Sequence, residues 1–283
     1  MASESQFHKR IVSDILVPVD FSVNSDNALI YAINIARQCN AKLWILHCYR
    51  LIQTVPEMEG VAGFSLKEVL EKAWKDEFEK LKKNYFHEDF TNYSFLLEIG
   101  FPEDVIKLQT KKIPIDLVIM GTAGATGIGE ILGSTTSKVV DMVDCPVLAI
   151  PASARFNGIK KVTIAYDEEK VNDPNSYSMI LNLVRKFKSK LDIVNFNTTL
   201  KTGGKESEGR LSLDPYLDGV KHKYHFKAAG KIEKAITDFV EAEGTDILVM
   251  VAHDHGFIES LFHSSITRKM VLHAKTPLLI IHE

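Results

Sequence analysis

Short apolar runs alternate along the chain with segments whose apolar residues recur at helical spacing. The first run covers residues 11–19, and beyond Ser22, a favourable helix N-cap, apolar residues return every three or four positions from Ala28 to Ala36. Further strands are predicted at Leu43–Cys48, Tyr93–Ile99, Leu117–Met120 and Val147–Ile150, and helices at Leu66–Phe86, Pro102–Thr110 and Ser134–Val143. This alternation is typical of an α/β protein with a parallel sheet covered by helices on both faces.

The same pattern occurs twice. IVSDILVPVD ends in Asp20 and IKKVTIAYD ends in Asp167, while DLVIM at 116–120 is matched by DILVM at 246–250. The halves close with CPVLAI (145–150) and TPLLII (276–281). A repeat of this length predicts two copies of one domain, residues 1–152 and 158–283, joined by a short loop at 151–158.

The second copy differs between its predicted strands Leu191–Phe196 and Lys221–Phe226. Residues 201–219 (KTGGKESEGRLSLDPYLDG) are polar and carry glycine and serine. They are too polar for a long helix, so we predict a loop with room for one short helix.

Composition excludes several classes of protein. The chain has 283 residues, 45% of them hydrophobic, so it is too apolar for a disordered protein. A net charge of -3 argues against a basic nucleic-acid surface, and the apolar runs are far shorter than the roughly 18 residues of a membrane span. The start, MASESQFHKR, lacks the apolar core of a secretory signal.

The cysteines indicate a reducing compartment. Cys39, Cys48 and Cys145 form no metal-type pair, leave one over from any disulfide and sit beside apolar segments. We therefore expect three small buried side chains in a cytoplasmic protein.

A glycine-rich loop follows the fourth strand. Five of the chain's 16 glycines lie between 121 and 133, directly before a helix that begins Ser134-Thr135-Thr136. Glycine lets the backbone approach a ligand, and a helix N-terminus offers free N–H donors, so together they can cradle a phosphate. The alternative is a flexible loop whose glycines serve turn geometry. The loop is neither a P-loop, because no lysine follows Gly133, nor a dinucleotide fingerprint, because Gly127-Ile128-Gly129 continues as Glu-Ile-Leu.

With these features the chain resembles the universal stress proteins, over nearly its whole length and as two tandem copies. The family signature is Gly-x2-Gly-x9-Gly-Ser/Thr after the fourth strand, with an aspartate ending the first. Asp20, Gly121, Gly124 and Gly133-Ser134 match it, although eight residues rather than nine separate Gly124 from Gly133. The resemblance implies two doubly wound domains, each a five-stranded parallel sheet of order 3-2-1-4-5, with an adenine nucleotide across the strand ends.

The resemblance also implies roles for particular residues. The base and ribose would be bordered by Pro18, Val19 and Asp20, whose carboxylate would accept from ribose hydroxyls. The backbone of Cys48 would face adenine, Met120 and Gly121 would flank the ribose, and the phosphates would be held by Gly124, Gly133, Ser134 and Thr135. From the residues alone, Asp20 is also a turn residue before the first helix, and the Cys48 side chain is core packing.

The second copy has lost this signature. Aligned without gaps, Val251, Asp254 and His263 replace the three glycines, and Ser264 alone keeps its type. A carboxylate facing phosphate is repulsive, so we expect one nucleotide per chain, in the first copy. His253, Asp254, His255 and His263 also form a metal-like set, but surface histidines on a loop without a nucleotide role are the better interpretation.

The expected function is that of a stress-response regulator that binds ATP or another adenine nucleotide, with or without Mg²⁺. No base, activated nucleophile or arginine is apparent beside the loop, so fast catalysis is not expected, while slow ATP hydrolysis stays open. The alternatives are a slow nucleotidase or nucleotide-dependent transferase, and a nucleotide-free interaction module. The apolar strands Val147–Ile150 and Leu278–Ile281 are predicted to pair within the chain, and homodimer formation is plausible. No nucleic-acid or membrane partner is expected.

Overall fold

The computed structural model describes residues 12–50, 66–86, 90–122, 134–166, 174–197, 214–252 and 276–282. The first half contains β1 (Asp14–Pro18), α1 (Val23–Cys39), β2 (Lys42–Tyr49), α2 (Leu66–Tyr85), β3 (Tyr93–Ile99), α3 (Pro102–Lys112), β4 (Leu117–Gly121), α4 (Ser134–Met142) and β5 (Val147–Ile150). The second contains β6 (Lys161–Tyr166), α5 (Pro174–Phe187), β7 (Lys190–Asn197), the 3-10 helix η1 (Asp214–Tyr216), β8 (His222–Ala228), α7 (Ile232–Glu243), β9 (Ile247–Ala252) and β10 (Leu278–His282).

Both halves have the predicted topology. The strand order is β3-β2-β1-β4-β5 in the first half and β8-β7-β6-β9-β10 in the second, which is 3-2-1-4-5 each time. All strand pairs within a half are parallel. The predicted fold, two tandem doubly wound units, is therefore confirmed.

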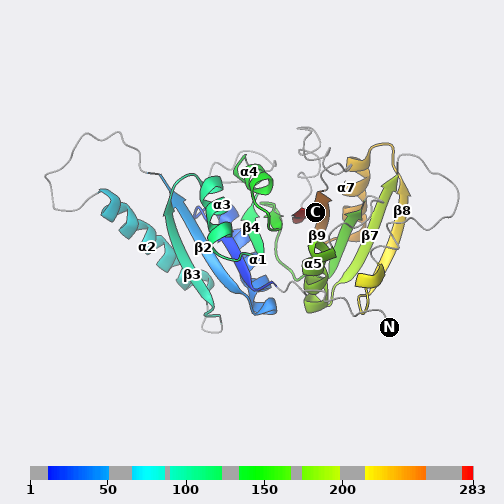
Figure 1. Cartoon of the computed structure of the whole chain (residues 1–283), viewed down its shortest axis with the longest axis horizontal. Helices are drawn as coiled ribbons and strands as arrows, with labels where there is room; N and C mark the ends of the chain where they lie inside the picture. The colour runs from blue at the N-terminus through cyan, green and yellow to red at the C-terminus, as the bar shows by residue number, and fades with distance from the viewer. Residues whose placement is uncertain are drawn as a thin grey trace.

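The two halves share one sheet. Strand β5 pairs with β10 antiparallel, with Leu148 opposite Leu279, so that the described residues form one sheet of ten strands that ends at β3 and β8 (Figure 1). The predicted pairing of the two apolar edges is confirmed. Pairing them satisfies backbone groups that two separate domains would leave exposed.

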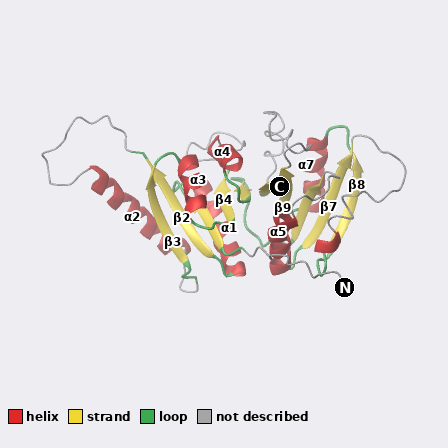
Figure 2. Ribbon diagram, viewed as in Figure 1, coloured by secondary structure: helices red, strands yellow, loops and turns green. Residues whose placement is uncertain are grey.

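Helices cover both faces of this sheet (Figure 2). Along β1, Ile15 and Val17 pack into one core with α1, α2 and α5, whereas Leu16 packs into the other with α3, α4 and α7. Successive strand residues point to opposite faces, and both faces are buried. This is why the strands read as continuous apolar runs rather than as alternating ones.

Helix α1 also contacts the segment that connects the two halves. The side-chain amide of Asn27 donates to the carbonyls of Pro151 and Ala154 in the connecting segment, at 3.2 and 2.8 Å. Tyr31 meets Phe156 edge to face, with ring centroids 5.1 Å apart. The connection between the halves is therefore held by buried contacts as well as by the shared sheet.

The repeated aspartate of DLVIM and DILVM has a structural role. Asp116 accepts from the backbone N–H groups of Ser13 and Asp14 at 2.8 and 3.1 Å. Asp246 accepts in the same way from Lys160 and Lys161, at 2.7 and 2.8 Å. Each carboxylate thus fastens the entry to the first strand of its half.

Further predictions concern the cap of α1, the 201–219 loop and the cysteines. Ser22 caps α1 as expected, since its hydroxyl accepts from the N–H of Ser25 at 3.2 Å. The 3-10 helix η1 is a short helix within the predicted 201–219 loop, of which residues 201–213 lie outside the described part. Cys39 and Cys145 are buried, Cys48 is half-buried, and all three are free thiols. Among the described helices, none is long and apolar enough to cross a membrane.

Candidate functional site

The predicted nucleotide residues gather at the carboxyl ends of β1, β2 and β4. Pro18 ends β1, and Val19 continues beside β2 by donating its N–H to the carbonyl of Leu46 at 2.8 Å. Val19 is buried, whereas Asp20 is exposed. Strand ends at one edge of a parallel sheet are where ligands of such folds bind.

Asp20 belongs to a tight turn that leads into α1. Its Oδ1 accepts from the N–H of Ser22 at 3.1 Å, and its own N–H donates to the hydroxyl of Ser25 at 3.3 Å. The next residue, Phe21, has a φ of 60°, which is uncommon for a bulky residue. The turn interpretation of Asp20 is confirmed, and the exposed carboxylate can still accept from a ligand.

Cys48 contributes differently through its side chain and its backbone. Lys42 donates its N–H to the carbonyl of Ser13, and the carbonyl of Leu46 accepts from the N–H of Val19. The backbone groups of the even-numbered residues of β2 therefore face β1. The same alternation directs the backbone of Cys48 toward the β1 side, past Pro18.

The Cys48 thiol is an unsuitable nucleophile. Burial, reinforced by the nearby carboxylates of Glu98 and Glu103, raises the pKa of Cys48 to about 12. The thiolate is the reactive form, so at neutral pH this side chain is unreactive. The prediction that the side chain is packing material agrees with its place beside the core of α3 and α4.

Strand β4 and helix α4 are joined at this edge. Met120 is buried, Gly121 ends β4, and the carbonyl of Gly121 accepts from the hydroxyl of Thr136 in the first turn of α4, at 2.9 Å. Thr136 is 2% exposed. The bond holds the start of α4 next to the end of β4, which is the placement that a phosphate cradle requires.

The remaining predicted residues are described only in part. Ser134 begins α4, and Thr135 follows it with a half-buried side chain. Gly124 and Gly133 lie outside the described residues, so their phosphate-binding roles stay predictions.

A cation one turn into α4 is already paired. The ammonium of Lys138 donates to Glu103 of α3 at 2.6 Å. This hydrogen bond is the main reason that the pKa of Glu103 lies below its usual value. Lys138 therefore joins α4 to α3 in the described structure.

The prediction missed His47, a buried histidine at the same edge. Its Nδ1 lies 2.8 Å from the carbonyl of Val19, and its ring packs among Phe21, Trp74 and Phe78. The signal in the sequence is one histidine within the otherwise apolar strand WILHCY.

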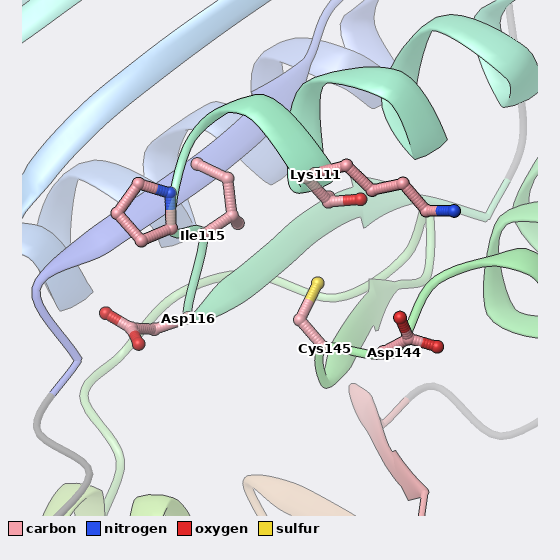
Figure 3. A pocket seen from close by; sticks show the side chains of 7 residues that line it. Lys111, Ile115, Asp116, Asp144 and Cys145 are labelled. Atoms are coloured by element: carbon pink, nitrogen blue, oxygen red, sulfur yellow. The ribbon is translucent and has the colours of Figure 1, made fainter.

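A separate pocket of about 290 Å³ lies at the opposite, amino edge of β4 and β5. Figure 3 shows Asp116 and Asp144 at its two ends and the thiol of Cys145 between them, with Lys111 above. Asp116 already holds the entry to β1, and the predicted nucleotide residues lie at the other edge. This pocket therefore does not belong to the candidate site.

The second half has a polar cluster on its sheet, also near the amino edge. Buried Asp192 accepts from Nε2 of His225 at 2.8 Å and lies 3.5 Å from the ammonium of Lys161, which also meets Glu243 at 2.7 Å. Strand register places Lys161 and Asp192 where the first half has Asp14 and Trp44, which are joined by a 2.8 Å hydrogen bond. The second half thus has an ion pair at the strand positions where the first half has the Asp14–Trp44 hydrogen bond.

The second copy's strand ends lie mostly outside the described residues. This applies to Asp167 and to Asp254, Ser264 and the histidines 253, 255 and 263, so the predicted loss of nucleotide binding and the metal-like set stay untested.

Comparisons with known proteins agree with this architecture. A universal stress protein of Methanocaldococcus jannaschii is 29% identical over 143 residues, covering 50% of this chain and 84% of that protein. One from Thermus aquaticus is 32% identical over 139 residues, covering 48% and 96%. The crystal structure of a universal stress protein from Archaeoglobus fulgidus has a TM-score of 0.67 at 16% identity and covers 96% of this chain and 97% of that chain, which shows a shared fold.

The match to the family itself is twofold. The model of the universal stress protein family matches residues 12–151 and again residues 158–282. Both matches coincide with a five-stranded unit of the sheet. The chain belongs to the universal stress protein family, as a tandem member with two copies of the family domain.

Proposed function

We propose that the first half binds ATP or a related adenine nucleotide at the carboxyl ends of β1, β2 and β4, and that the chain is a nucleotide-responsive regulator. One observation carries the proposal. The exposed carboxylate of Asp20, in the turn just after β1, lies at the same sheet edge where Thr136 holds the start of α4 to Gly121. A carboxylate and a helix N-terminus thus follow two neighbouring strands, β1 and β4, which supports a site for ribose and phosphate there.

The arrangement of the described residues supports a place for the sugar and the base. The carboxylate of Asp20 is suited to accept from the two ribose hydroxyls, flanked by Met120 and Gly121. The backbone groups of Cys48, directed past the end of β1, would pair with the edge of adenine, with Pro18 and Val19 beside it.

The phosphates would lie at the start of α4. The first N–H groups of a helix lack partners within it, and the hydroxyls of Ser134 and Thr135 are proposed to add donors. Gly124 and Gly133 are proposed to let the backbone approach, and Mg²⁺ would neutralise part of the phosphate charge.

Fast chemistry is not part of the proposal. Two described groups near the edge are unsuited to catalysis: the Cys48 thiol stays protonated, and the ammonium of Lys138 is paired with Glu103. The nucleotide would act by binding, and slow hydrolysis is the secondary outcome to be measured.

The setting of this function is also proposed. The free cysteines favour a reducing compartment, the cytoplasm. Because β5 and β10 already cover each other, a homodimer would have to use another surface.

The test is nucleotide titration of the whole chain by calorimetry, together with mass spectrometry of ligand released on denaturation. We expect one adenine nucleotide per chain. Asp20→Asn keeps an oxygen that accepts from Ser22 but loses the charge, and should weaken binding about tenfold, equivalent to about 1.4 kcal/mol. Gly124→Val should weaken binding by steric block.

The second half provides a matched control. Asp167→Asn changes the sequence-equivalent aspartate and should leave affinity unchanged. Rapid phosphate release that disappears in Asp20→Ala would instead establish a nucleotidase or transferase. No binding at millimolar nucleotide would favour the alternative of a nucleotide-free interaction module.

A further inference from the structure

His47 connects the turn that carries Asp20 to helix α2. It lies on the α1 and α2 side of the sheet and is 6% exposed. A carbonyl can only accept, so the 2.8 Å contact with Val19 requires the hydrogen on Nδ1. The neutral ring therefore holds the Val19 carbonyl and leaves Nε2 as a bare acceptor.

The turn depends on the aromatic packing around this ring. Phe21 has a left-handed backbone, a conformation that is unfavourable for a residue with a side chain. Its ring stacks on Trp74 at 5.8 Å with an interplanar angle of 4°, and lies 4.7 Å from His47. The strained residue next to Asp20 is thus held by a side chain of α2.

Two buried nitrogens in this cluster have no hydrogen-bond partner among the described residues. They are Nε2 of His47 and Nε1 of Trp74, whose ring centroids lie 4.3 Å apart. One is an acceptor and the other a donor. A proton added to Nε2 would create a second donor with no acceptor, in a shell of aromatic rings.

The charges that face His47 come from the turn. The charge of Asp20 acts on the ring, and it also acts on Asp26 of α1. Helix α2 presents Trp74 and Phe78, while its neighbouring charged residues 75 and 76 are exposed. Burial lowers the pKa of His47, whereas the hydrogen bond to Val19 and the charge of Asp20 raise it. Burial is the largest of the three effects, so the pKa of His47 lies below its usual value.

We propose that His47 is a positioning residue for the nucleotide site, which couples the Val19–Asp20 turn to helix α2 while its imidazole is neutral. This inference rests on the proposed nucleotide function. Protonation places an unsolvated cation against Phe21, Trp74 and Phe78. The contact then opens to hydrate the ring, α2 loses its hold on Phe21, and the Asp20 carboxylate loses its fixed position.

The experiment follows Trp74 and nucleotide affinity together as the pH falls. The chain has two tryptophans, so Trp44→Phe leaves Trp74 as the one tryptophan, whose emission can be excited selectively over that of tyrosine. Imidazolium quenches indole on contact. We expect Trp74 emission to change with a midpoint below 6.5, the ordinary histidine value, with or without nucleotide, and affinity to fall about tenfold on full protonation.

His47→Asn is the matched variant. Its amide nitrogen replaces Nδ1–H as donor to Val19 and cannot be protonated in this range. It should bind nucleotide at pH 7.5 within about threefold of the parent chain. The Trp74 emission and the nucleotide affinity should both lose the part of their pH dependence that comes from His47. His47→Leu, which lacks the donor, should bind about tenfold more weakly at every pH. Should His47→Asn fail to fold, Trp74→Phe keeps the ring, and its affinity must retain the pH dependence.

The outcomes separate the two proposals. A Trp74 titration that persists in His47→Asn, or no titration above the acid unfolding of the chain, overturns the coupling. A titration that depends on His47, with nucleotide affinity insensitive to Asp20→Asn, overturns the nucleotide site and keeps the link between the turn and α2.

Discussion

Thr136 and Gly121 are joined by a hydrogen bond of 2.9 Å, from the first turn of α4 to the last residue of β4. The bond spans 15 residues of sequence and fixes where the helix begins relative to the strand end. The proposed phosphate position depends on this contact, because it sets which way the helix N-terminus faces.

Thr136→Val should therefore reduce both stability and nucleotide affinity. Valine has the same shape but leaves the Gly121 carbonyl without its partner, which costs about 1–2 kcal/mol. Urea unfolding measures the stability change. Thr135→Val, at a half-buried position, is the control for stability and should change it less; equal losses of stability in both variants would contradict the assignment.

The Asp192 cluster should stabilise the second half. Asp192→Asn removes a buried charge that faces Lys161 and His225, and should lower the free energy of unfolding by about 2 kcal/mol. Glu243→Gln removes a more exposed partner of Lys161, so less than about 1 kcal/mol is expected. A larger loss in Glu243→Gln than in Asp192→Asn would show that the buried carboxylate is not the main contributor.

Asp26 should weaken the fold at neutral pH. Burial raises its pKa, against the opposing hydrogen bond from Tyr85 of 2.8 Å. The folded state then binds the proton more readily than the unfolded state, so the contribution of Asp26 to stability rises as the pH falls. Relative to Asp26→Asn, the parent chain should gain less than about 1 kcal/mol between about pH 6 and about pH 4, because the carboxyl is partly solvated. Urea unfolding at both pH values checks this, and a parent chain that loses stability relative to Asp26→Asn on acidification would contradict it.

The β5–β10 pairing should hold even when the chain is divided. Residues 1–157 and 158–283, co-expressed as separate chains, should form a 1:1 complex through the edge where Leu148 meets Leu279. Light scattering after gel filtration measures the mass. Leu279→Asp introduces a charge at a site that is 1% exposed and should abolish the complex. If the unmodified halves elute as monomers, pairing of β5 with β10 is not strong enough to hold separate chains together, and the prediction is wrong.

Much of this protein is determined locally by its sequence. Apolar runs that end in Asp20 and Asp167, each followed by helical spacing, predict the strands, the crossovers and the internal repeat, because strand and helix periods are properties of short segments. The predicted Asp20 turn and Ser22 cap were likewise readable, since both depend on neighbours within a few residues.

Contacts between distant segments were decided by the tertiary structure. The sequence marks His47 as one polar residue in an apolar strand, but nothing near it in the chain indicates that Val19 and Trp74 would contact its ring. Asp116 could equally have been a ligand residue until its bonds to Ser13 and Asp14 were seen. Such partners lie some 27 to 103 residues away, and their meeting follows from how strands are ordered and helices are laid across the sheet, which no local pattern encodes.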